Sequence, residues 1–523
     1  MLATNVRRRV GMPRNFLIAV LVLSTVVLLF KGVSAVPLIE KTITYPFQRD
    51  DAEGVILAEA TLIAGGTNPY QHQPSPAPYF YAGPYPPIYT VINAVAVAVA
   101  GPTLKVGRGV QFFATGAVAA WLVWAVGWPR HRTGNRQWAV WLAGLWAALL
   151  WLTAHLVTVW AVLVRPDMTA LAWNLLGVVA LRQWWDIPQK IPIYQEKTWA
   201  TRDEIVILAL GAACFALGWW TKQTFIAVPV AFMLTLFPVR LRVAAVLAAL
   251  YAGFLAVPFT VLTVLTGGGF AQKVIGYQGS WDWGAFERFA TSFATRYGLL
   301  LSVAVLTALA ISVRERRLTF AVAWFALAGI AALGAGTSGG NHNHFVELLA
   351  AAALLVGQGV ADGLRNVTIG TARAQLAALC VAFAIVLLTG TAAFEREGRY
   401  GWLAREYAVP SQSEREGTAA VASYLANAPA PVYSDNVGIL VVARQPVRVT
   451  DPFTMAAEVR LGRWDDAGLV ADVAAGKYSV IAIRERDLDP NHPPTDMTPA
   501  LVRAILARYR LAERNVLNLY VPK

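Results

Sequence analysis

An acidic segment near the N-terminus carries the residues best suited to proton transfer. Arg49, Asp50, Asp51 and Glu53 follow the first long apolar run of a chain in which acids are scarce. A carboxylate can accept the proton of a substrate hydroxyl, so this segment is a candidate for general-base chemistry. The alternative is a solvated acidic surface without a catalytic role, and the charge pattern is compatible with both interpretations.

Three further polar groups occur where apolar runs end. They are Arg165-Pro166-Asp167, Thr221-Lys222-Gln223, and Asn341-His342-Asn343-His344 with Glu347. A basic side chain can hold and stabilise a leaving phosphate, and Lys222, Arg49 and Arg165 are the candidates for that role. Ionisable groups that converge at one membrane depth are typical of a site for a substrate with a lipid tail and a polar head.

Each of these groups also has a purely structural interpretation. Arg165 and Asp167 could pair with each other as a cap, and Lys222 could be a lysine that extends to the membrane interface. His342 and His344 are two positions apart, a spacing that does not suit a pair of metal ligands on a helix. We therefore expect these histidines to hydrogen-bond a polar head group.

The elements that must position these residues are membrane helices. The chain has 523 residues, of which 57% are hydrophobic and 14% charged, and its mean hydropathy is +0.50. A soluble chain would carry about a quarter charged residues. The net charge of +13 comes from bases scattered in short groups between apolar runs, which indicates a lipid bilayer as partner and no nucleic acid. Cys214 and Cys380 lie in separate apolar runs and predict neither a disulfide nor a metal site.

Eleven apolar runs are predicted to span the membrane, because about 20 helical residues cross the hydrocarbon core. They are 15–36, 109–127, 137–160, 167–183, 204–220, 224–239, 242–265, 297–313, 318–336, 344–361 and 374–394. A further short run, 87–101, would invert every later loop if it crossed, and the bases of 130–136 and 314–317 would then lie outside. The positive-inside rule therefore favours an interfacial helix at 87–101.

This topology makes residues 37–108 one long outer loop that carries the acidic segment, with a helix predicted over 52–64. Residues 1–394 form the predicted membrane domain. Residues 395–523 regain charge and predict a small soluble α/β domain on the same outer face. Its expected elements are helices near 415–427 and 499–509 and strands near 478–483 and 516–521.

The order and spacing of these motifs resemble the GT-C glycosyltransferase superfamily, in particular its protein O-mannosyltransferase and lipid A aminoarabinose transferase branch. The motifs are the acidic segment, Tyr85-Pro86-Pro87-Ile88-Tyr89, and the three span-end groups described above. The resemblance implies a GT-C α-helical polytopic membrane protein with about eleven transmembrane helices. It also implies a polyprenyl-phosphate sugar donor, usually inversion, and action at the outer face of a plasma membrane.

Site roles follow from the same resemblance. The acid of the first outer loop is the expected base, Asp51 before Asp50, with Glu53 as the third acid; many relatives have Asp followed directly by Glu, but here Ala52 intervenes. Asp167 is expected to assist, and Lys222 to lie near the donor phosphate. The residues expected to contact substrate are Tyr85, Gln223, Asn341, His342, Asn343, His344 and Glu347. A divalent cation, Mg²⁺ or Mn²⁺, is left open because some members bind one and others do not.

The function favoured by the sequence is a glycosyltransferase whose acceptor is a protein, a glycolipid or a cell-envelope glycan. Two other function classes are alternatives. A transporter or flippase of lipid-linked sugars would favour internal repeats and mid-membrane sites, and the sequence has no convincing repeat. A non-catalytic scaffold with a sensing C-terminal domain would leave the outer acids dispensable. The chain also has no glycine-rich nucleotide loop, which argues against a nucleotide sugar or ATP as substrate.

Overall fold

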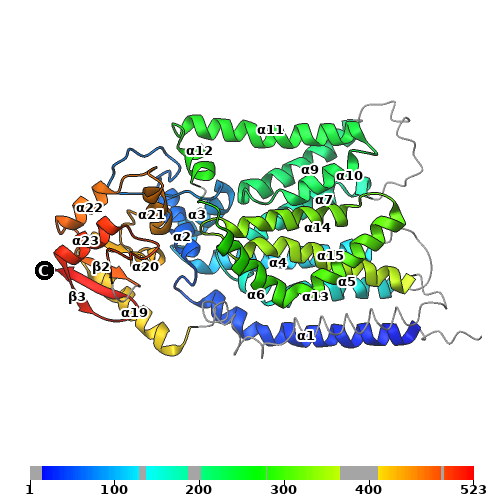
Figure 1. Cartoon of the computed structure of the whole chain (residues 1–523), viewed down its shortest axis with the longest axis horizontal. Helices are drawn as coiled ribbons and strands as arrows, with labels where there is room; N and C mark the ends of the chain where they lie inside the picture. The colour runs from blue at the N-terminus through cyan, green and yellow to red at the C-terminus, as the bar shows by residue number, and fades with distance from the viewer. Residues whose placement is uncertain (1–13, 129–136, 186–201, 278, 366–409, 485–487) are drawn as a thin grey trace, which may run out of the picture.

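The computed structural model describes residues 14–128, 137–185, 202–277, 279–365, 410–484 and 488–523. The described part consists of a bundle of long helices and a smaller unit at one end of it, which we call the C-terminal unit (residues 410–523) (Figure 1). The helices of the bundle run roughly along the long axis of the molecule. The predicted span over 374–394 and the predicted boundary at 394 lie outside the described residues.

The bundle is built from apolar helices that follow the predicted runs. They are α1 (Arg14–Thr44), α4 (Leu104–Gly127), α5 (Gln137–Leu152), α7 (Asp167–Ala180), α9 (Arg202–Thr221), α10 (Ala227–Leu236), α11 (Leu241–Leu265), α13 (Trp283–Glu315), α14 (Phe320–Ala331) and α15 (Val346–Arg365). Within the described ranges, six helices are long and apolar enough to cross a membrane: α1, α4, α9, α11, α13 and α15. The others are shorter than the ~20 residues that cross a bilayer core without help from flanking segments.

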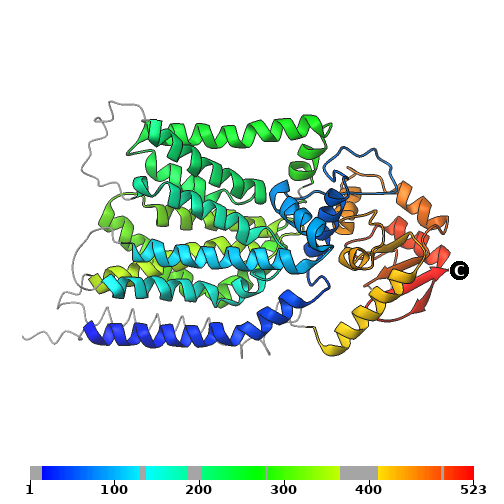
Figure 2. The same ribbon diagram turned by 180° about the vertical axis from the view of Figure 1, so that it is seen from behind.

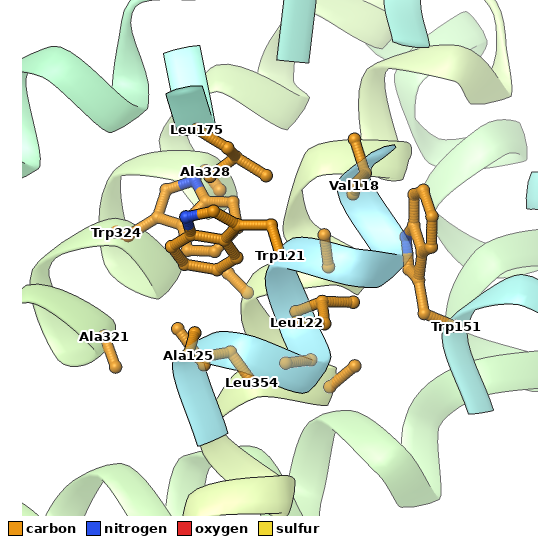
Figure 3. Close-up of a cluster of buried hydrophobic side chains, with 14 of the residues drawn as sticks. Val118, Trp121, Leu122, Ala125, Trp151, Leu175, Ala321, Trp324, Ala328 and Leu354 are labelled. Atoms are coloured by element: carbon orange, nitrogen blue, oxygen red, sulfur yellow. The ribbon is translucent and has the colours of Figure 1, made fainter. Parts of the chain in front are cut away.

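Large aromatic side chains fill the centre of the bundle. Trp121 of α4 meets Trp324 of α14 edge to face, with ring centroids 5.7 Å apart, and Leu175 of α7 lies beside them (Figure 3). Helices also approach closely where glycine permits it. A Cβ at Gly144 of α5 would lie 2.6 Å from the carbonyl oxygen of Val123 in α4. The bundle therefore forms a tightly packed platform for the residues at its end.

The segment between α1 and α4 folds into two short helices, α2 (Asp51–Ala64) and α3 (Pro87–Ala100), which lie between the bundle and the C-terminal unit (Figures 1 and 2). Asp50 caps α2 by accepting a hydrogen bond from the Ala52 amide. Gly65 ends the helix, and Gly66 follows with φ of +84°, a conformation that favours glycine. The two helices match the expected ranges 52–64 and 87–101.

The C-terminal unit is a four-stranded mixed sheet with helices packed on it. Its elements are α19 (Gln412–Asn427), β1 (Val432–Ser434), α20 (Val437–Val442), α21 (Pro452–Arg460), α22 (Ala467–Ala474), β2 (Val480–Ile483), α23 (Pro499–Arg508), β3 (Tyr509–Glu513) and β4 (Asn518–Pro522). The strand order is β1-β2-β4-β3, with β1 and β2 parallel and the other pairs antiparallel. The sequence did not predict α20, α21, α22 or β3, which are short.

The segment between α1 and α4 is joined to the C-terminal unit by direct hydrogen bonds. The Phe80 amide donates to the Arg448 carbonyl at 2.7 Å, and the Thr450 amide donates to the Phe80 carbonyl at 2.9 Å. The Gly438 amide donates to Gln48 Oε1 at 2.7 Å. These contacts place the start of α2 against the C-terminal unit, so residues far apart in sequence face each other there.

Candidate active site

A cavity of about 430 Å³ opens between the end of the bundle and the C-terminal unit. The start of α2, the hairpin tip after α9, the segment between α14 and α15, and residues 451–454 contribute to its walls. Nine of the residues predicted for the site line it: Asp50, Asp51, Tyr85, Arg165, Lys222, Gln223, Asn341, Asn343 and His344. Polar groups from separate span ends therefore do converge in one place.

Asp50 is held by an arginine. Its two carboxylate oxygens accept hydrogen bonds from Arg165, at 2.7 Å from Nε and 2.6 Å from Nη2. One of these oxygens also caps α2 through the Ala52 amide. Such a bidentate ion pair fixes both side chains in position. Asp50 therefore links α2 to the segment before α7, and Arg165 pairs with Asp50 instead of with Asp167.

Asp51 has a different environment from its neighbour. Its side chain is 57% exposed, and it lines both this cavity and a second one of about 690 Å³ in the C-terminal unit. One oxygen accepts hydrogen bonds from Arg484 Nη1 at 2.7 Å and from Gln48 Nε2 at 3.2 Å. Partial burial among the surrounding protein raises the pKa of Asp51, and the Arg484 guanidinium opposes that rise.

Lys222 and Asp167 form a buried ion pair at the cavity wall. Lys222 Nζ donates to Asp167 Oδ1 at 2.6 Å, and Asn343 Nδ2 donates to the same oxygen at 2.8 Å. The second Asp167 oxygen and Asn343 Oδ1 are buried with no hydrogen-bond partner in the described part of the chain. This arrangement keeps a positive charge at the cavity and leaves acceptor capacity beside it.

Tyr85 and Gln223 complete the same wall. Gln223 Nε2 donates to the Pro84 carbonyl at 2.9 Å, which joins the hairpin tip to the segment between α1 and α4. The Lys222 amine lies 6.0 Å from the centroid of the Tyr85 ring. Burial raises the pKa of Tyr85 to about 12, so its phenol stays protonated at neutral pH and can donate a hydrogen bond.

Comparison with solved structures identifies the architecture. ArnT from Cupriavidus metallidurans bound to undecaprenyl phosphate is similar over 94% of this chain and 97% of its own, with 13% identity and a TM-score of 0.55. The same protein in the apo state gives a TM-score of 0.54 at 13% identity, over 94% of this chain and 96% of its own. The chain has the GT-C fold. This likeness confirms the mostly helical GT-C fold expected from the sequence.

The other comparisons add little to this GT-C assignment. The Archaeoglobus fulgidus oligosaccharyltransferase in its apo form is similar over 89% of this chain and 69% of its own at 13% identity, with a TM-score of 0.49. No model of a known protein family matches the chain, and no curated protein matches it. The geometry of the site is therefore the basis for assigning its chemistry.

Within the GT-C fold, Glu53 and Arg49 lie outside the cavity, contrary to their predicted roles. Glu53 is fully buried and its two oxygens accept hydrogen bonds from Arg108 of α4, at 2.8 Å from Nε and 2.7 Å from Nη2. The amides of Arg49 and Val164 donate to the same carboxylate at 2.8 Å each. These four hydrogen bonds occupy the lone pairs of the carboxylate, so Glu53 has none with which to accept a substrate proton. Its role is to fix the start of α2 against α4. Arg49 Nη1 donates a hydrogen bond to Thr42 Oγ1.

His342 and Glu347 also point away from the cavity. His342 Nε2 lies 3.1 Å from Ser292 Oγ, and its ring packs edge-on against Phe289. Glu347 Oε1 accepts a hydrogen bond from Trp324 Nε1 at 2.9 Å inside the bundle. Of the predicted histidine pair, only His344 lines the cavity, because the turn between α14 and α15 directs the two side chains differently.

The carboxylates of the site are not arranged for a divalent cation. Asp50 is tied to Arg165 and Asp51 to Arg484. Among the described residues, no group of three or more His, Cys, Asp or Glu side chains could hold a metal ion. These residues do not fit Mg²⁺ or Mn²⁺ in this arrangement, and no step of the reaction below is assigned to a metal.

Sequence reasoning missed the residues that the C-terminal unit contributes. Asp451 and Thr454 line the cavity, and Asp435, Arg484 and Asp496 line the second one. A signal did exist for two of them. Asp435 follows β1 and Arg484 follows β2, and the carboxyl ends of adjacent parallel strands lie at one edge of a sheet.

Proposed function

We propose that this protein is a membrane glycosyltransferase that moves a sugar from a polyprenyl-phosphate carrier to a hydroxyl group of an acceptor. The observation that carries the proposal is the single cavity lined by the accessible Asp51 carboxylate, the Lys222 amine and Arg165. A base for the acceptor and positive charge for the leaving phosphate are the two requirements of this reaction. The undecaprenyl phosphate bound to ArnT, which shares the fold, supports the choice of donor.

Asp51 is assigned as the base. As the acceptor oxygen attacks the anomeric carbon, Asp51 takes the hydroxyl proton, and the bond from that carbon to the phosphate oxygen breaks. The polyprenyl phosphate leaves with the bonding electrons, and Lys222 and Arg165 stabilise its charge. Attack opposite the leaving group inverts the anomeric centre. Asp50 is less suited to this step, because Arg165 engages both of its oxygens.

We assign the reaction to the outer face of a plasma membrane, with residues 1–394 as an eleven-span membrane domain and 395–523 as an outer domain. The loop between α13 and α14 lies at the end of the bundle opposite the C-terminal unit (Figure 1) and contains Arg316 and Arg317, with Arg314 in the last turn of α13. Base-rich loops stay in the cytoplasm. We therefore infer that the loop 37–108, which carries the acidic segment, and the cavity lie outside. The acceptor class is a protein, a glycolipid or an envelope glycan.

The test is a transfer assay with purified protein, radiolabelled polyprenyl-phosphate sugars and a panel of acceptors from the cell envelope. We expect the wild type to form labelled product and Asp51→Asn to lower kcat by at least ~100-fold, the usual scale of general-base catalysis. Asp203→Asn is the matched control, because this exposed acid begins α9 and does not line the cavity.

Two outcomes would contradict the proposal. Full activity of Asp51→Asn would reject the assignment of the base. Movement of the lipid-linked sugar across vesicle membranes, with no product formed, would favour the alternative of a transporter.

A further inference from the structure

The residue that reaches Asp51 from the C-terminal unit is Arg484, which directly follows β2. Its Nη1 donates to Asp51 Oδ1 at 2.7 Å, across 433 positions of sequence. The same guanidinium contacts Asp435 Oδ2 at 3.4 Å from Nε and Asp496 Oδ2 at 3.3 Å from Nη2. Arg484 is thus fixed between two carboxylates of its own unit and one of α2.

The anchoring of Arg484 does not depend on its side chain alone. Its main-chain amide donates to both Asp435 oxygens, at 3.2 and 3.0 Å. Asp435 is buried and follows β1, the parallel neighbour of β2. The sheet therefore sets the position of Arg484, and a substitution of its side chain leaves the amide contact to Asp435 in place.

We propose that Arg484 is a positioning residue of the active site, which holds the Asp51 carboxylate ionised and oriented toward the acceptor hydroxyl. The inference rests on the proposed role of Asp51 as the base. By this role of Arg484 the C-terminal unit becomes a direct part of the active site. Its sheet positions the guanidinium that keeps the Asp51 carboxylate ionised.

The charges around Asp51 favour this role. Burial, Asp50 of the same helix start and Asp496 of the C-terminal unit all raise the pKa of Asp51, and Arg484 lowers it. Asp435 and Asp451 border the same second cavity and add negative charge. Because a base must be ionised to accept a proton, Arg484 keeps Asp51 active at lower pH than its neighbours alone would allow.

The experiment is a pH profile of kcat/KM for sugar transfer by the full-length protein and three variants. In Arg484→Gln we expect the acidic limb to move up by about one pH unit, the scale of a close opposite charge. Arg484→Lys keeps the charge and should return the limb most of the way toward the wild-type value. Arg448→Gln is the control, because its side chain is 38% exposed against 40% for Arg484 and pairs with Asp472, away from both cavities.

An Arg484→Gln protein that transfers sugar with the acidic limb of the wild type overturns this inference and leaves the proposed function intact. Absence of transfer by the wild type with every donor rejects the proposed function and this inference with it. Thermal unfolding of each variant separates loss of fold from loss of positioning. If Arg484→Gln does not fold, Arg484→Met, which keeps most of the side-chain volume without the charge, takes its place, and an acidic limb at the wild-type position in that variant also overturns the inference.

Discussion

At the scale of single residues, adjacent acids have separate tasks. Both line the cavity, but Asp50 is nearly buried, caps α2 and binds Arg165, whereas the Asp51 side chain is 57% exposed. The scarcity of acids in a hydrophobic chain was enough to find both from sequence. Their division of labour was not predictable, because it depends on Arg165 and Arg484, which lie 115 and 433 positions away. Glu53 was misjudged for the same reason, since its partner Arg108 comes from α4.

The buried pair of Glu53 and Arg108 should dominate local stability. Both side chains are fully buried, so Arg108→Met leaves a charged carboxylate without its cation. We expect a loss of about 3–5 kcal/mol in the free energy of unfolding, measured by denaturation in mixed micelles. Arg314→Gln is the control: that side chain is 46% exposed, and its pairs with Glu315 and Asp362 should be worth no more than about 1 kcal/mol. Equal losses in the two variants would contradict this interpretation.

At the scale of elements, α2 is the contact between bundle and C-terminal unit. The range 52–64 was predictable because an acidic cap precedes an apolar helix that two glycines end. What α2 packs against was not, since helix periodicity carries no information on a partner that comes late in the chain. Gly54 shows the consequence: it lies against Gln48 Oε1, and a Cβ there would be 2.7 Å from the Gly438 amide.

Gly54→Ala should therefore separate α2 from the C-terminal unit. Gly116→Ala in α4 is a matched control, because a Cβ there meets nothing within 4 Å and the change in helix propensity is the same. We expect Gly54→Ala to lower Tm and to expose the C-terminal unit to limited proteolysis, and Gly116→Ala to raise Tm slightly and to leave the protease resistance unchanged. Resistance of Gly54→Ala to protease at the wild-type level would show that the contact yields without cost.

At the scale of the whole molecule, composition and the positive-inside bias were enough for a helical membrane protein, and motif order for the GT-C fold. Bilayer crossing was harder to derive, because helices such as α5 and α7 are shorter than a hydrocarbon core. The cavity itself could not be derived, because its walls come from segments spread between residues 50 and 495. Only their assembly creates the site.

The proposed topology predicts which surfaces face the cytoplasm. In a background with both native cysteines replaced by alanine, Ser413→Cys in exposed α19 should react with a membrane-impermeant maleimide in intact cells. Leu318→Cys, 45% exposed between α13 and α14, should react only after permeabilisation. The reverse pattern would invert the orientation, and labelling of both sites in intact cells would contradict the span count between them.

The hydrogen bonds of Phe80 to Arg448 and Thr450 have a consequence for biosynthesis. The neighbouring bond from the Ala82 amide to the Thr450 hydroxyl joins residues 368 positions apart. At about 5–20 residues per second, the ribosome needs about 20–70 s to supply the second partner after the first. During that time the segment around Phe80 has emerged without its partner, and Asp51 has no Arg484. The contact between these early and late parts of the chain therefore forms only after the C-terminal unit has been synthesised, and a chain that ends before residue 484 lacks the partner of Asp51.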